Sequence, residues 1–163
     1  MIWEAFQAAA PEMAPLAAEQ FARTGVALLG TLRRDGSPRI SPIEPVIAHG
    51  PLLLGMMWHS MKALDLLRDP RCVLHSAVTS VEGTEGECKL YGRALAAQDT
   101  ELRARHHRAF TEHWGSSAPA SFHVFSLEIA SAAYITYDGD AGQMLVKRWN
   151  PQMGLWEIRR PYP

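Results

Sequence analysis

The feature that most constrains the fold of this sequence is a pair of apolar-rich runs joined by Asp35-Gly36. VALLGTLRR covers residues 26–34, and SPRISPIEPVIA covers residues 37–48. An Asp-Gly pair favours the tight turn whose twist matches two antiparallel strands, so this arrangement predicts a β-hairpin. The second run contains three prolines. Because proline cannot donate to a strand ladder, we expect the second strand to be bulged or to lie at a sheet edge.

Further short apolar runs follow this hairpin, and turn signals separate them. We expect strands at 51–58, 71–78, 87–97, 122–137, 144–149 and 154–160, with turns at His49-Gly50 and Asp138-Gly139. Gly92 within the run 87–97 indicates a bulge or a bend. A series of short strands with tight turns and few helices is typical of a small antiparallel barrel. Strands do not alternate with long helices, so a doubly wound sheet is not expected.

Helices are expected in three places. The N-terminal segment 1–23 favours helix, and Pro11 separates a short first piece from a longer second one. Shorter helical segments are expected near 60–68 and 99–113. The 163 residues contain no internal repeat and suffice for one core. We therefore expect a single domain, 1–163, in which residues 24–163 form the barrel.

The composition excludes several classes of protein. Hydrophobic residues make up 47% and charged residues 20%, which is typical of a globular chain. A net charge of −1 provides no general field for nucleic acid or an anionic membrane. No apolar run approaches ~20 residues, and the N-terminus does not resemble a signal peptide. Cys72 and Cys88 indicate a reduced, cytoplasmic protein, although a disulfide between them is left open.

The stretch LLLGMMWHSMKALDLLRDPR, residues 52–71, contains the candidate binding site. A helix that begins near Ser60 would present free N–H groups and the positive end of its dipole to an anion. Lys62 adds a positive charge, and Arg39 on the preceding hairpin could lie across the sheet from them. The neighbouring methionines and Trp58 offer a soft, flat surface to an aromatic ring. A phosphate with a flat heterocycle describes flavin mononucleotide (FMN), although a helix cap, a solvated lysine and core methionines would explain the same residues.

The segments GTLRRDGSPRISPI (30–43) and GMMWHSMKALDLLRDPR (55–71) together resemble the pyridoxamine 5′-phosphate oxidase-like, FMN-binding split-barrel family. The shared pattern is a strand, a D-G turn, P-R-hydrophobic-S, and a strand that leads to S-x-K, a leucine-rich turn and D-P-R. RWNPQMGLWEIRRP at the C-terminus is compatible with the family, so the resemblance covers most of the chain from residue 24. It implies a mainly β, antiparallel split β-barrel with flanking helices. It also implies a homodimer with the cofactor at the subunit interface.

The resemblance also implies roles for individual residues. Arg39, Ser60 and Lys62 would bind the phosphate, and Ile40 and Ser41 would flank the isoalloxazine ring. Met56 and Met57 would contact the ribityl chain or the ring, while Arg148 and Trp149 would reach the cofactor of the partner subunit. The candidate cofactor-binding residues are therefore Arg39, Ile40, Ser41, Met56, Met57, Trp58, Ser60, Met61, Lys62, Arg148 and Trp149. No catalytic residue is nominated, because the chemistry would reside largely in the flavin.

The sequence departs from family members that oxidise pyridoxamine phosphate. Met61 stands where they carry an arginine, and VKRW at 146–149 replaces their R-x-H element. Glu87 or Cys88 stands where they often carry a glutamine. Vitamin B6 oxidation is therefore not expected, and the expected function is FMN-dependent oxidoreduction of an unidentified small molecule. Two alternatives remain: a deazaflavin (F420)-dependent reductase on the same fold, and a non-catalytic flavin- or haem-binding protein.

The densest histidine cluster is His106, His107 and His113 in the predicted helix 99–113. His106 and His113 share a helix face, but no carboxylate on the same stripe of the helix and no second ligand pair accompanies them. A solvated helix explains this cluster better than a metal site. His59, inside the cofactor-like stretch, is a better candidate for touching a ligand.

Overall fold

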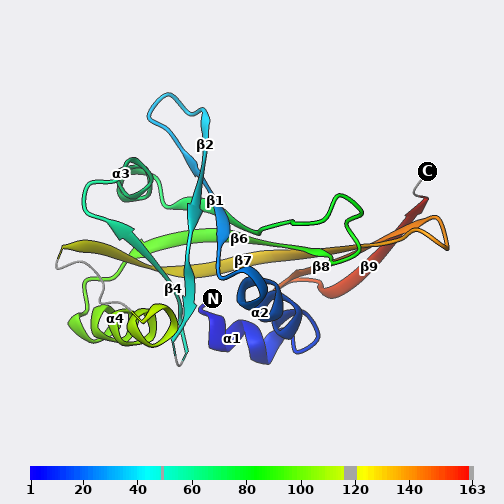
Figure 1. The fold of residues 1–163 in the computed structure, drawn as a ribbon, viewed down its shortest axis with the longest axis horizontal. Coiled ribbons are helices and arrows are strands. Elements are labelled where there is room, and N and C mark those ends of the chain that lie inside the picture. Colours follow the sequence, from blue (N-terminus) through cyan, green and yellow to red (C-terminus); the bar gives the residue numbers. More distant parts are fainter. Residues whose placement is uncertain (49, 116–120, 162–163) are drawn as a thin grey trace.

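The structure is a computed structural model that describes residues 1–48, 50–115 and 121–161 (Figure 1). The helices are α1 (Trp3–Ala9), α2 (Met13–Thr24), α3 (Met61–Arg68) and α4 (Thr100–Trp114). The strands are β1 (Ala27–Leu32), β2 (Pro38–Ile43), β3 (Pro45–Ile47), β4 (Leu52–Met57), β5 (Arg71–Ser76), β6 (Glu87–Ala96), β7 (Phe122–Asp138), β8 (Gln143–Asn150) and β9 (Gly154–Pro161). The expected fold class, mainly antiparallel β with flanking helices, is confirmed. The expected turn residue His49 lies outside the described residues.

The strands form one sheet whose order is β2-β1-β5-β6-β7-β4-β3, with β8 and β9 attached beyond β7. β2 and β3 lie at opposite ends of this path although only Glu44 separates them in the chain. The sheet must therefore curl until its two ends meet, which makes it a barrel. The expected position of residues 37–48 at a sheet edge is confirmed, but these residues form two strands and not one, and Pro38 and Pro45 each begin one of them.

The hairpin predicted from Asp35-Gly36 is present. β1 and β2 pair antiparallel from Ala27 opposite Ile43 to Leu32 opposite Pro38. Gly36 has a φ of +83°, a backbone conformation that favours glycine.

The bulge predicted at Gly92 is also present, since the register between β6 and β7 shifts between Tyr91 and Gly92. A Cβ atom at Gly92 would lie 1.9 Å from the carbonyl oxygen of Glu128. Only glycine therefore allows the two strands to approach this closely.

The last three strands form a long arm. β7 is 17 residues long, and its second half pairs with β8, which in turn pairs with β9. Figure 1 shows the free end of this arm projecting away from the barrel. The expected C-terminal hairpin is confirmed, with strands slightly longer than the apolar pattern indicated.

Two hydrophobic clusters position the helices. The larger fills the barrel and extends to α1 and α2, where Trp3 and Phe6 are fully buried. The smaller, which includes Leu53, Phe122 and Val124, lies beneath α4. α4 is thereby held over β3, β4 and β7, on the face that points away from the barrel core.

Both cysteines are free thiols, with Cys88 buried and Cys72 partly buried. Burial raises the pKa of each to about 12. Among the described residues, no helix has the length and apolar character needed to cross a membrane.

Candidate functional site

The candidate phosphate-binding residues lie where the N-terminal end of α3 meets β2. Ser60 occupies the position before α3, but its side chain does not cap the helix. Its Oγ atom is buried and has no hydrogen-bond partner. A buried hydroxyl without a partner costs free energy, so this atom needs an explanation. An anion held at the start of α3 would accept a hydrogen bond from the Ser60 hydroxyl and further hydrogen bonds from the free backbone N–H groups.

Lys62 lies one residue inside the same helix and reaches β2. Its Nζ atom donates to the backbone oxygen of Pro42. Burial lowers the pKa of Lys62, while the carboxylate of Glu44 raises it in part. An ammonium group has three donor hydrogens, so this contact leaves two of them for another acceptor.

Arg39 also reaches this junction, where it pairs with a carboxylate that the sequence analysis did not single out. Arg39 Nε lies 2.6 Å from Asp65 Oδ2, and Asp65 is only 2% exposed. Asp65 also accepts a hydrogen bond from Thr31 Oγ1 at 3.0 Å. Burial alone would raise the pKa of Asp65, but the hydrogen bonds from Arg39 and Thr31 and the nearby guanidinium groups lower it overall.

The ionised Asp65 therefore holds Arg39 in place through Nε. The other guanidinium N–H groups can still donate to an anion. Asp65 and Lys62 are three residues apart on α3 and thus lie on the same side of the helix, facing β2. The structure therefore brings Arg39, Ser60 and Lys62 to one helix–strand junction. The feature of the sequence that could have pointed to Asp65 is its spacing of three residues from Lys62, which places both on one side of the helix.

Large apolar side chains surround this junction and face solvent. Ile40 on β2 is 72% exposed and Met57 at the end of β4 is 70% exposed. Trp58 and Met61, which flank Ser60 in the chain, are more than half exposed. Soluble monomers rarely leave many large apolar side chains together in water, so this surface is unusual for an isolated chain.

The remaining predicted site residues lie elsewhere or are more deeply placed. Ser41 is partly buried on β2, whereas Met56 is buried in the barrel core. Arg148 is exposed on β8.

The structure places Trp149 in the core of its own chain. Trp149 is 1% exposed, and its ring meets Phe6 edge-on with the ring centroids 5.0 Å apart. Its Nε1 donates to the carbonyl oxygen of Ala9 at 3.3 Å. Trp149 therefore anchors α1 to β8 within its own chain, and its contact with a partner's cofactor stays a prediction.

A cavity of about 350 Å³ opens beside this junction, beneath α4. Its lining residues are Pro42, Glu44, Gly55, Met56, Met57, Lys62, His106, Phe110 and Phe122. His106 is the buried residue of α4, and neither of its ring nitrogens has a hydrogen-bond partner. Burial, assisted by the nearby charges of His107 and Arg103, lowers the pKa of His106 to about 4. The solvated helix expected from the sequence thus has one face on a cavity.

An aromatic group lies at the end of β4. The rings of Trp58 and His123 are stacked at 4.3 Å with only 8° between their planes. Burial lowers the pKa of His123, and its Nε2 has no hydrogen-bond partner. His59 has a φ of +58°, which is uncommon outside glycine. Within the described residues, no three histidine, cysteine or acidic side chains are grouped to hold a metal ion.

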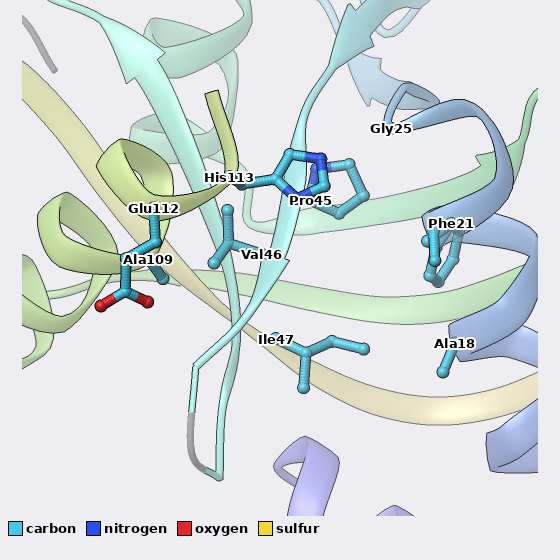
Figure 2. Close-up of a pocket in the computed structure, with 10 residues that line it drawn as sticks. Ala18, Phe21, Gly25, Pro45, Val46, Ile47, Ala109, Glu112 and His113 are labelled. Carbon is cyan, nitrogen blue, oxygen red and sulfur yellow. The ribbon is translucent and has the colours of Figure 1, made fainter. Parts of the chain in front are cut away.

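Figure 2 shows a second cavity, of about 390 Å³, between α2, β3 and α4. Val46 and Ile47 of β3 lie between Phe21 of α2 and Ala109 of α4. Among its described lining residues, none has a buried polar atom without a partner. This cavity therefore shows less sign of a polar ligand than the cavity beneath α4.

Comparisons with known proteins identify the fold. No protein-family model matches the sequence, and no curated protein matches it. A pyridoxamine 5′-phosphate oxidase-related, FMN-binding protein from Nostoc punctiforme matches with a TM-score of 0.64 at 12% identity, covering 90% of this chain and 95% of that one. A heme-binding protein from Mycobacterium smegmatis matches with a TM-score of 0.63 at 16% identity, covering 93% and 89%.

PhzG from Burkholderia lata, in complex with tetrahydrophenazine-1-carboxylic acid, matches with a TM-score of 0.63 at 14% identity, covering 94% and 93%. These proteins differ in what they bind, and identities this low carry information about the fold alone. The chain therefore has the split-barrel fold of the pyridoxamine 5′-phosphate oxidase-like proteins, as the resemblance implied.

Proposed function

We propose that this protein binds FMN at the junction of α3 and β2 and acts as an oxidoreductase on a small molecule. The observation that supports this most is the buried Ser60 Oγ, which has no partner and lies at the start of a helix beside Lys62 and Arg39. A phosphate monoester supplies the acceptor oxygens and the negative charge that these three residues lack. The residues present thus fit the phosphate end of FMN.

Each residue has a distinct part in this site. Ser60 and the first N–H groups of α3 donate to phosphate oxygens. Lys62 adds a positive charge that is partly desolvated by burial. Asp65 acts as a positioning residue, because it holds Arg39 by Nε and leaves the other guanidinium N–H groups free to donate.

The exposed apolar side chains around the junction suit the flat part of the cofactor. Ile40, Met57 and Trp58 would cover an aromatic ring system and exclude water from one side of it. Bound FMN supplies hydride transfer, and the chain supplies binding and orientation.

We further propose that two copies of the chain associate over this surface. Besides Met61, Leu64 and Leu67 on α3 are 40% and 50% exposed. A second copy would cover these side chains and complete two equivalent sites. Light scattering should give twice the chain mass, and Leu64→Glu should lower it to that of a monomer; a wild-type monomer would contradict the association.

The phosphate assignment is tested by comparing FMN with riboflavin, which lacks the phosphate. Lys62→Ala should weaken FMN binding by about 1.5–3 kcal/mol, the range for a charge-assisted hydrogen bond, and should leave riboflavin binding nearly unchanged. Flavin fluorescence titration measures both affinities. Arg34→Ala, an exposed arginine in the turn of the β1–β2 hairpin, is the matched control.

Arg39→Ala should have an effect of similar size on FMN, but it also removes a partner of the buried Asp65. Its unfolding curve must therefore be measured alongside. Equal FMN affinity in wild type and Lys62→Ala would refute the phosphate site.

The absorption spectrum of the purified protein distinguishes the cofactors. Two bands in the visible and near ultraviolet identify FMN, whereas a Soret band identifies haem. A colourless protein that binds F420 and not FMN on titration would support the deazaflavin alternative.

A further inference from the structure

His106 is a buried polar side chain for which the proposed flavin site gives no role. It is 2% exposed, lies on the inner face of α4, and lines the cavity beneath that helix. Both of its ring nitrogens are buried without a hydrogen-bond partner. A buried imidazole in this state costs free energy, and most such groups in proteins are paired.

Strand β4 has space for the His106 imidazole because Gly55 has no side chain. A Cβ atom on Gly55 of β4 would lie 2.3 Å from both Cε1 and Nε2 of His106. Glycine in the interior of a strand weakens the strand and often marks a close approach by another group. Here the missing side chain is what allows His106 to lie against β4.

The surroundings of His106 favour a neutral aromatic ligand. The ring of Phe110 lies 5.9 Å away at 28°, and that of Phe122 lies 5.5 Å away at 37°. The Arg103 guanidinium is 5.1 Å from the centre of the Phe122 ring. Lys62 and Glu44 both lie on the cavity wall, so their opposite charges offset one another and favour a ligand without a net charge.

The hydrogen-bonding capacity of His106 further limits the class of ligand that the cavity can bind. Its lowered pKa, about 4, keeps the imidazole neutral near pH 7. A neutral imidazole has one donor and one acceptor nitrogen. A carboxylate can only accept, so it can pair with the donor nitrogen alone, whereas a hydroxyl group can accept from the donor nitrogen or donate to the acceptor nitrogen.

We propose that the cavity beneath α4 binds a monocyclic aromatic molecule that carries a hydroxyl group, and that His106 hydrogen-bonds to this hydroxyl. The volume of about 350 Å³ is near the lower end of small-molecule sites, about 300–1,000 Å³, as a single ring requires. The cavity shares Lys62 and Met57 with the flavin junction. The inference thus rests on the proposed function, for which it names the class of substrate.

The test compares phenol with toluene, which has a methyl group in place of the hydroxyl. Imidazole ¹⁵N signals of the full chain, recorded without FMN, report on His106 directly. Because both nitrogens are buried, a hydroxyl reaches them only when the imidazole or a neighbouring ring turns. Phenol should therefore shift the His106 signals, and toluene should not.

Phenol should also bind about three- to tenfold more tightly than toluene, as expected for one neutral hydrogen bond. His106→Phe should remove this preference. The matched control is His113→Phe, because His113 lies on the same helix but lines the other cavity (Figure 2). His106→Gln retains a donor and an acceptor and should keep part of the preference, which provides a second variant if His106→Phe does not fold.

Several results would overturn the inference. The inference would be wrong if the His106 signals did not respond to saturating phenol. It would also be wrong if folded His106→Phe kept the preference for phenol over toluene. A Soret band with added hemin that is lost in His106→Phe would make His106 a haem ligand instead. Failure to bind FMN with a normal phenol response would refute the flavin proposal and leave this cavity assignment supported.

Discussion

The N-terminal helical layer, which consists of α1 and α2, differs from the junction of α3 and β2 in which side chains are buried and which polar groups are paired. In the helical layer, apolar rings such as Trp3 and Phe6 are buried, and several polar groups are paired with residues far away in the chain. The amino terminus donates to the Ile129 carbonyl at 2.8 Å, and Gln20 Nε2 donates to the Glu85 carbonyl at 2.7 Å. The exception is Trp3 Nε1, which is buried without a partner.

At the junction, apolar side chains face solvent and Ser60 Oγ is buried without a partner, and in the cavity beside it both His106 ring nitrogens are also buried without partners. Each of these features costs stability in the isolated chain. A ligand or a second subunit would offset the cost. We therefore expect the helical layer to contribute mainly to stability and the junction mainly to binding. Each expectation can be tested.

The largest expected effect is that of Trp149→Ala on β8, whose ring packs against Phe6 of the helical layer. The variant should lose about 3–5 kcal/mol of unfolding free energy, because it leaves a large cavity next to Phe6. Denaturant unfolding measures the loss. Trp58→Ala, at the junction, is the control and should lose less than about 1 kcal/mol, because Trp58 is half exposed. Similar losses in the two variants would remove the distinction between the regions.

A somewhat smaller effect is expected from pH. The pKa of His106 is about 4 in the folded protein, below its ordinary value of 6.5, so the unfolded chain takes up the proton first. This contribution to stability is complete above pH 6.5 and is lost as the pH falls toward 4. Between pH 6.5 and 4.5 the loss should be about 2–3 kcal/mol.

Denaturant unfolding at several pH values measures this slope, and His106→Phe should remove most of it. The pKa of His123 is lowered as well, so a part of the slope with the same sign should remain in that variant. A wild-type slope that His106→Phe leaves intact would contradict a neutral, unpaired His106.

The smallest effect on stability is expected for Ser60→Ala. An ordinary N-cap serine contributes about 1 kcal/mol, but Ser60 makes no capping hydrogen bond. We therefore expect the melting temperature to stay the same or rise, while FMN binding weakens by about 1 kcal/mol. A clear fall in melting temperature with unchanged FMN affinity would make Ser60 a structural cap.

Local patterns in the sequence predicted much of the fold and part of the site. The Asp35-Gly36 hairpin, the start of α3 after Ser60 and the bulge at Gly92 each depend on a few adjacent residues. The division of residues 37–48 at Glu44 was not predicted, because it depends on which distant strands β2 and β3 join. The sequence also did not indicate that Asp65 would pair with Arg39.

The sequence by itself determined where the chain turns, where its helices begin, and which short stretch concentrates cationic and soft apolar side chains. Turn chemistry and helix starts act over a few residues, so they can be recognised in the chain as written. The tertiary structure decided that Trp149 belongs to the core and that His106 lies on a cavity. Trp149 bonds to Ala9, 140 residues away, and His106 rests on Gly55 of a distant strand, so only the folded chain brings these partners together.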